Sequence, residues 1–252
     1  MTNKLIYFIG NWKMFGDFSS IKIINKIDKF FSVFKKKHKK NKIVLCVPNP
    51  LIYFLSKNKT IKNISIGAQN CHHEKHGPFT GSVSAAMIKS SGAKFVILGH
   101  SDNRSEGDTN KKIKDKIATA LEEKLNVIFC IGETLRQKKQ KKTFTVLKKQ
   151  LKDSLIKSFD SEKIMVAYEP VWSIGTGKTP KMVELAKIFI FIKKEIKKNL
   201  KTKKRAIVLY GGSVSDKNVS MFSSIRDIDG FLIGGASRSS KKFIDIIKNY
   251  YK

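Results

Sequence analysis

The sequence predicts an α/β protein in which eight parallel strands close into a (β/α)8 barrel ringed by helices. Eight short, β-branched apolar runs recur along the 252 residues, and amphipathic segments separate them. Each run is continuous in hydrophobicity, which is typical of parallel strands buried on both faces. A doubly wound sheet is the alternative, but no G-x-G-x-x-G follows the first run, and eight equivalent units fit a closed ring better.

The expected strands cover residues 5–10, 43–48, 64–69, 95–100, 127–132, 164–169, 206–212 and 230–235. Helical periodicity is clearest over residues 21–34, 145–159 and 183–196. The stretches rich in Pro, Gly or Ser are short and fall just after strands, so none resembles a linker. We therefore expect one domain over residues 1–252.

The composition limits the classes of protein to consider. With 41% apolar residues the chain can bury a substantial core, yet no run of 18 apolar residues predicts a membrane span. The first residues, MTNKLIYFIGNWKMF, lack the layout of a signal peptide. Cys46, Cys71 and Cys130 are odd in number and lack the spacing of metal ligands. We expect reduced thiols in a cytoplasmic protein.

The formal net charge of +31 comes almost entirely from lysine. Two lysine-rich runs, 35–42 and 197–204, directly precede the second and seventh expected strands. Segments that lead into strands lie at the bottom of a barrel, whereas active sites lie at the top. A solvated lysine shell is thus favoured over a polyanion-binding patch. A nucleic-acid reader would be expected to cluster arginines and exposed aromatic residues, and the sequence shows neither.

Unusual polar residues occur where strands are expected to end, which is where barrels carry their chemistry. Asn11 and Lys13 follow the first strand, His100 ends the fourth, and Glu169 ends the sixth. Each is a weak signal alone, because a single Lys, His or Glu there is more often an ordinary surface or satisfied polar group. Together with glycine pairs after the last two strands, in YGGSVS and IGGASR, they predict a site that binds a phosphate through backbone N–H groups.

Nine motifs in order, from Asn11 to Ser237, carry a family resemblance: GNWKM, GAQN, FTG, GHS, CIGE, AYEPVW, IGTGK, YGGSV and DGFLIGGAS. The chain resembles the triosephosphate isomerases. The resemblance implies a TIM barrel and an aldose–ketose isomerase of glycolysis and gluconeogenesis, acting as a cytoplasmic homodimer. It would interconvert dihydroxyacetone phosphate and D-glyceraldehyde 3-phosphate through an enediol(ate), with neither a metal nor another cofactor. Neither a membrane nor a nucleic-acid partner is expected.

The resemblance also implies roles for individual residues. Glu169 would accept the proton, His100 would be the neutral electrophile, and Lys13 and Asn11 would complete the catalytic set. Substrate contacts would come from Asn11, Trp12, Lys13, Gly175, Ser213, Gly234 and Gly235, the glycines and Ser213 through backbone N–H groups. A lid and its latch would comprise Pro170, Val171, Trp172, Ser173, Ile174, Gly175, Thr176, Gly177, Lys178 and Tyr210. The dimer contact would comprise Gly77, Pro78, Phe79, Thr80 and Met14.

The match has departures. After His-Ser the family usually has Glu-Arg-Arg, whereas this chain has Asp102-Asn103-Arg104. Ser82 replaces the usual Glu after Phe-Thr-Gly, and the segment after Lys178 is about two residues shorter. A barrel kept only as a scaffold is a rival hypothesis, but it would be expected to have lost Glu169, His100 or Lys13.

Two further features could be mistaken for functional sites. The run CHHEKH, residues 71–76, could suggest a metal cluster, yet its spacing fits no common zinc pattern. Glu133 in CIGE is expected to be a structural acid near the site rather than a second base.

Overall fold

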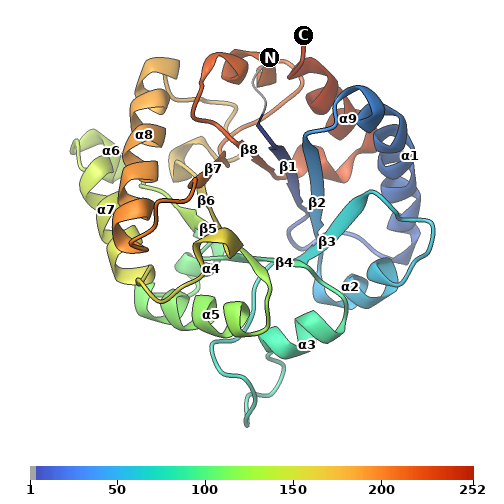
Figure 1. Ribbon diagram of the computed structural model, residues 1–252, viewed down its shortest axis with the longest axis horizontal. Helices are drawn as coiled ribbons and strands as arrows, with labels where there is room; N and C mark the ends of the chain where they lie inside the picture. Colours follow the sequence, from blue (N-terminus) through green and yellow to red (C-terminus); the bar gives the residue numbers. More distant parts are fainter. Residues whose placement is uncertain (1–3) are drawn as a thin grey trace.

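The computed structural model describes residues 4–252, and its strands form a closed parallel barrel in sequence order (Figure 1). The strands are β1 (Ile6–Asn11), β2 (Asn41–Cys46), β3 (Ile64–Ala68), β4 (Phe95–Leu98), β5 (Asn126–Ile131), β6 (Ile164–Tyr168), β7 (Ile207–Tyr210) and β8 (Gly230–Ile233). The ring closes where β1 pairs in parallel with β8, with Tyr7 opposite Gly230. The predicted (β/α)8 architecture is confirmed.

Helices surround the strands on all sides (Figure 1). They are α1 (Ile21–Lys37), α2 (Asn49–Ser56), α3 (Ala85–Ser90), α4 (Ser101–Ser105), α5 (Asn110–Glu122), α6 (Leu135–Lys139), α7 (Thr143–Ser154), α8 (Met182–Asn199) and α9 (Ser240–Asn249). Short 3-10 turns occupy Phe18–Ser20, Ser161–Lys163, Val171–Ser173, Val219–Ser224 and Gly235–Arg238. Among residues 4–252, none of the helices has both the length and the apolar character that a membrane span requires.

The strands place alternate side chains in two separate cores, because successive residues of a strand point to opposite faces. In β1, Tyr7 and Ile9 point into the barrel, whereas Ile6 and Phe8 pack against the helices. The inner core includes Val44, Cys46, Phe95, Ile97, Ile128, Cys130, Met165, Ala167, Leu209 and Leu232. Side chains fill the barrel, so a ligand site has room only at one of its ends.

Several element boundaries differ from those the sequence predicted. The helix expected over 145–159 ends at Ser154, because buried Leu155 adopts an extended backbone. The second strand begins at Asn41 and ends at Cys46, and Pro48 instead caps α2. Strands β4 and β6 end at Leu98 and Tyr168, so the polar residues predicted to end them lie in the following loops. Because these side chains lie in loops, they can reach a cleft, whereas side chains inside the packed barrel cannot.

The two ends of the barrel differ in their connections. The lysine run 35–42 covers the end of α1 and the start of β2, and the run 197–204 covers the end of α8 and the connection toward β7, as expected for the end of the barrel where strands begin. At the opposite end, the long connection between β3 and α3 extends outward beyond the ring of helices (Figure 1).

Candidate active site

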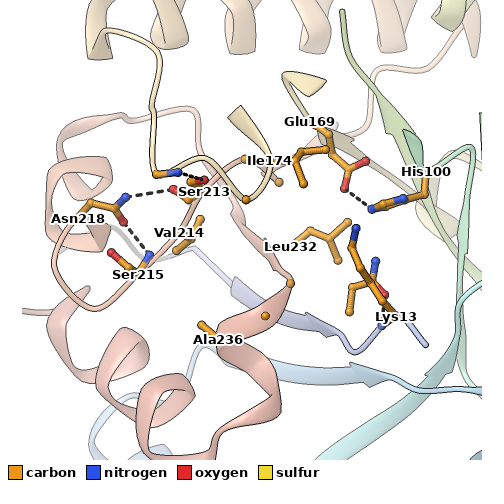
Figure 2. A pocket seen from close by; sticks show the side chains of 17 residues that line it. Lys13, His100, Glu169, Ile174, Ser213, Val214, Ser215, Asn218, Leu232 and Ala236 are labelled. Carbon is orange, nitrogen blue, oxygen red and sulfur yellow. Dashed lines mark hydrogen bonds and ion pairs between the residues drawn. The ribbon is translucent and has the colours of Figure 1, made fainter. Parts of the chain in front are cut away.

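A cleft opens at the carboxyl ends of the strands, and five separate connections contribute to it. Its lining comprises Asn11, Lys13, His100, Glu169, Ile174, Gly175, Gly177, Gly211, Gly212, Ser213, Val214, Ser215, Asn218, Leu232, Gly234, Gly235 and Ala236. Glu169, His100 and Lys13 come from different loops and point toward one another, beside Leu232 (Figure 2). The closure of the ring therefore brings together groups separated by up to 156 residues, as from Lys13 to Glu169.

Glu169 directly follows β6 and is almost completely buried, with 3% of its surface exposed. Its Oε1 lies 3.4 Å from Nε2 of His100, and its Oε2 has no hydrogen-bond partner. Burial raises the pKa of the carboxyl above its usual 4.5, against the opposing effects of His100, the Cys130 thiol and Lys13. Gly211 makes room for this side chain, because a Cβ there would lie 2.6 Å from Cγ of Glu169.

His100 is held in one tautomer by the start of the next helix. It occupies the N-cap of α4, where its Nδ1 accepts a hydrogen bond of 3.1 Å from the backbone N–H of Asp102. A ring nitrogen that accepts a hydrogen bond carries no proton, so the neutral ring has its hydrogen on Nε2. That N–H faces the cleft and Glu169.

Lys13 adopts the left-handed conformation, with φ of 55°, which is uncommon for a residue other than glycine. Gln69, at the end of β3, holds this turn: its Nε2 donates to the carbonyl of Lys13 at 2.9 Å and to that of Cys46 at 3.1 Å. The Lys13 ammonium lies 2.8 Å from Oδ2 of Asp102. Such strain persists only where the surroundings fix the backbone, and it is common at functional sites.

Part of the cleft is lined by the backbone of glycines rather than by charged side chains. Gly234 and Gly235 follow β8, and the second of them begins a 3-10 turn. Gly175 approaches the same space from the loop after β6. Successive backbone N–H groups at a tight turn bind anions well.

The comparisons with known proteins agree with this geometry. A family model for triosephosphate isomerase matches residues 6–250. The chain is 40% identical to the triosephosphate isomerase of Zygosaccharomyces bailii, over 95% of this chain and 96% of that protein. It is also 40% identical to the enzyme of Wolbachia pipientis wMel, over 97% and 93%. The chain belongs to the triosephosphate isomerase family.

A solved triosephosphate isomerase has the same fold. The crystal structure of the enzyme from Bartonella henselae superposes with a TM-score of 0.88 at 33% identity, covering 98% of this chain and 99% of the other. The likeness therefore extends over both the barrel and its connecting loops.

Two substrate contacts expected from the triosephosphate isomerase resemblance look different in the structure. Trp12 does not line the cleft; it is 2% exposed, packs in the outer core and donates through Nε1 to the carbonyl of Ser237 at 3.2 Å. Neighbouring side chains of an extended chain point to opposite sides, so Trp12 points away from the cleft that Asn11 and Lys13 line. Ser213 does line the cleft, but its N–H is not free, because it donates to Oγ of Ser173 at 3.2 Å.

The loop expected to be a lid lies over the cleft. Ile174, Gly175 and Gly177 line the cleft, and the N–H of Gly177 donates to Oγ of Ser213 at 3.1 Å (Figure 2). The segment is therefore in contact with the turn after β7, on the far side of the site.

Buried Glu133 supports the base of this loop. It accepts hydrogen bonds from Nε1 of Trp172 at 2.9 Å and from the hydroxyl of Tyr168 at 3.1 Å. Burial raises the pKa of Glu133 despite these donors. Its side chain is absent from the lining of the cleft, in keeping with the structural role expected of it.

Sequence reasoning gave no role to Gln69 or Asp102, although both contact predicted site residues. The sequence signals for these two residues were their positions. Gln69 lies in the motif GAQN, and Asp102 stands where the family usually has the Glu that follows His-Ser. Only the structure shows which groups they contact.

The segment 71–76 forms no cation site in the structure. No group of three or more His, Cys, Asp or Glu side chains within residues 4–252 is placed to hold a metal ion. His72 instead accepts a hydrogen bond from the N–H of Glu74, and its ring packs at a tilt against those of His73 and Phe79.

Proposed function

We propose that this cleft interconverts dihydroxyacetone phosphate and D-glyceraldehyde 3-phosphate by moving a proton between adjacent carbons through an enediol(ate). One observation carries the assignment of residues: the buried, underpartnered carboxylate of Glu169 faces the Nε2–H of His100 in a cleft that also contains Lys13. Family membership supports the same reaction, which belongs to glycolysis and gluconeogenesis.

Glu169 is the base in this proposal. A carboxylate in water is a weak base, but burial raises its pKa and so improves its match to a carbon acid. The absence of a partner on Oε2 leaves a lone pair free to take the proton from either carbon.

His100 is the electrophile, and its neutral tautomer follows from the hydrogen bond at Nδ1. Its Nε2–H can donate to the carbonyl oxygen and then to the oxygen on the neighbouring carbon, without leaving a permanent charge in the cleft. Lys13 supplies the positive charge that stabilises the enediolate and the phosphate, and Asn11 orients the substrate oxygens.

The phosphate is bound by the N–H groups of Gly175, Gly234 and Gly235, which line the same cleft as Glu169. Ser213 contributes by holding the lid, since its N–H and hydroxyl already have protein partners. Lid closure excludes water and strengthens the charge interactions inside.

The proposal extends to the assembly and the cellular setting. Met14 is 93% exposed, and Phe79 lies on the projecting β3–α3 connection with exposed Gly77, Pro78 and Thr80. We propose that this apolar tip inserts beside Met14 of a second copy, giving a homodimer of one-domain chains. Sedimentation velocity of the parent and of Phe79→Asp tests this contact. The free, buried thiols of Cys46, Cys71 and Cys130 fit a cytoplasmic location.

An isomerase assay in deuterium oxide tests the reaction directly. Dihydroxyacetone phosphate is the only substrate added, and NMR follows both the product and its isotope. We expect D-glyceraldehyde 3-phosphate that carries deuterium at C2, because a proton held by Glu169 exchanges with solvent. Product formed without any isotope exchange would indicate hydride transfer and would refute the proposed base.

A further inference from the structure

Phe15 and Arg238 are two side chains that the proposed reaction leaves unused, and they contact each other. The guanidinium carbon of Arg238 lies 3.7 Å from the centre of the Phe15 ring. Phe15 follows Lys13 by two residues, and Arg238 ends the 3-10 turn that begins at Gly235. This cation–π contact therefore joins the loop that carries Lys13 to the turn that carries the proposed phosphate site.

Buried contacts already join the same two segments. Nε1 of Trp12 donates to the carbonyl of Ser237 at 3.2 Å, and the Ser237 hydroxyl donates to the carbonyl of Gly234 at 2.7 Å. Gly10 allows this approach, because a Cβ there would lie 2.8 Å from the Cβ of Ser237. These contacts hold the backbone of the two segments, so the ring of Phe15, which is 53% exposed, is not needed for the fold.

The use of arginine at position 238 is itself informative. Arg238 is one of five arginines among 51 basic residues, so lysine is the usual cation of this chain. Two of the other arginines use the planar guanidinium: Arg104 donates to two backbone carbonyls, and Arg205 pairs with Asp229. A guanidinium also stacks on an aromatic face better than an ammonium does, and Arg238 makes that contact with Phe15.

The guanidinium of Arg238 is held close to the cleft with its donors free. Its Nη2 lies 3.6 Å from the position that a Cβ would take at Gly235, which lines the cleft. Within the described residues, the guanidinium forms neither an ion pair nor a hydrogen bond. A contact through the face of the guanidinium leaves its in-plane N–H groups available to an anion.

We propose that Phe15 is a positioning residue for phosphate binding and that it acts through Arg238. The ring holds the guanidinium beside Gly235, where its N–H groups extend the backbone site for the phosphate dianion. A side chain that is already held loses less conformational freedom when the anion binds, so the contact strengthens binding. This inference rests on the proposed function, because the anion is the phosphate of the triose.

The experiment measures the Kd of inorganic phosphate by 31P NMR titration of the full chain at low salt, and this measurement needs no turnover. Phe15→Leu keeps an apolar side chain but removes the ring. We expect its Kd to be about two- to fivefold higher than that of the parent, the range that corresponds to an exposed cation–π contact. In Phe15→Trp the ring face remains, and the Kd should equal that of the parent or be lower. In the isomerase assay, Phe15→Leu should raise KM by the same factor and leave kcat unchanged.

Phe18→Leu is the matched control. Phe18 lies three residues further along the same connection and is 60% exposed, but its ring packs edge-on against that of Phe54. We expect its Kd for phosphate to stay within about 1.5-fold of the parent. A rise in Kd equal to that of Phe15→Leu would show that any exposed ring of this connection has the same effect, and would overturn the inference.

A double variant tests whether Phe15 acts through Arg238. In the Arg238→Ala background, Phe15→Leu should change the Kd by less than about 1.5-fold, because the guanidinium that the ring holds is gone. An equal effect of Phe15→Leu with and without Arg238, or an unchanged Kd in Phe15→Leu, would overturn the inference. A parent that binds inorganic phosphate but does not isomerise the triose would overturn the proposed function instead.

Discussion

Glu169 and Asp229 are two buried carboxylates at opposite ends of the same barrel, and their surroundings differ. Asp229 directly precedes β8 at the end where strands begin and is 1% exposed. It contacts Arg205, lies 3.1 Å from Nζ of Lys193 and accepts from the N–H of Val208 at 2.9 Å. Glu169 is equally buried at the other end, yet one of its oxygens has no partner.

The difference shows how one fold separates stability from chemistry. A buried charge is tolerated when ion pairs and hydrogen bonds replace its lost hydration, and the cations around Asp229 supply both. The same compensation at Glu169 would stabilise the carboxylate and make it a weaker base. The proposed base, Glu169, therefore lacks a partner on one oxygen at the end of the barrel that carries the cleft, whereas Asp229 has ion pairs and hydrogen bonds at the other end.

The largest expected effect comes from removing the charge at Glu169. Glu169→Gln should lower kcat about 10²–10⁴-fold, the contribution typical of a positioned base. The raised pKa means that the folded state loses stability as the pH rises from 4.5 through the folded-state value. At pH 8 the uncharged Gln should thus melt at the same temperature as the parent or higher. Near-parental turnover would contradict the assignment of Glu169.

Asp229→Asn should lower the stability and leave kcat nearly unchanged, the reverse of what we expect for Glu169→Gln. It removes the carboxylate partner of Lys4 and Arg205 and leaves Lys193 with Asp227, and we expect a loss of about 3 kcal/mol in the free energy of unfolding, measured in urea. The kcat of the protein that remains folded should stay within about twofold of the parent, because the site lies at the other end of the barrel.

The matched control is Asp227→Asn, which removes another partner of the same Lys193, 3.1 Å away. The Asp227 side chain is 35% exposed, so solvent screens this pair more than the pairs of Asp229, and we expect a loss of less than about 1 kcal/mol. Equal losses in the two variants would show that burial of Asp229 does not set its importance.

The pH profile sharpens the comparison at the catalytic end. Because burial raises the pKa of Glu169, kcat/KM should begin to fall at a pH above 4.5 and then drop about tenfold per unit as the base becomes protonated. The residual activity of Glu169→Gln should lack this limb. A parental profile that stays flat down to pH 4.5 would indicate that Glu169 titrates as an ordinary exposed acid.

The sequence predicted the barrel because its signals are local. A continuous apolar run such as 127–132 identifies a buried strand by itself, and observed β5 (Asn126–Ile131) differs from it by one residue. The end of α7 was harder to place. Leu155 and Phe159 continue the apolar spacing, but tertiary packing places Leu155 in an extended turn, which periodicity cannot reveal.

The site was predictable where a residue type at a strand end carries the signal, as for Lys13, His100 and Glu169. Contacts between side chains far apart in the sequence were not. The bond from Ser213 to Ser173 crosses 40 residues, and Trp12 turned out to face the core although both its neighbours face the cleft. Such contacts depend on the exact closure of the ring and on side-chain rotamers, neither of which has a local pattern.

The smallest expected effect concerns the cations that face solvent at the two ends. Arg238 follows the glycine turn after β8, and its guanidinium carbon lies 3.7 Å from the centre of the Phe15 ring. Among residues 4–252 no carboxylate lies within ion-pair distance of it. Its Nη2 is 3.6 Å from the position a Cβ would take at Gly235, which lines the cleft. Arg238 is therefore a fixed positive charge at the mouth of the cleft.

Such a charge should speed the capture of a dianionic substrate more than the numerous lysines at the other end. We expect Arg238→Ala to lower kcat/KM about two- to fivefold at low salt, with kcat unchanged, and to flatten the fall of kcat/KM as the Debye length shrinks from about 10 to 3 Å. The control is Lys203→Ala, which removes one exposed charge from the run 197–204 at the opposite end. If both variants change the salt dependence of kcat/KM equally, then capture of the substrate depends on the net charge of +31 and not on where the charges lie. The two ends of the barrel would then attract the substrate equally.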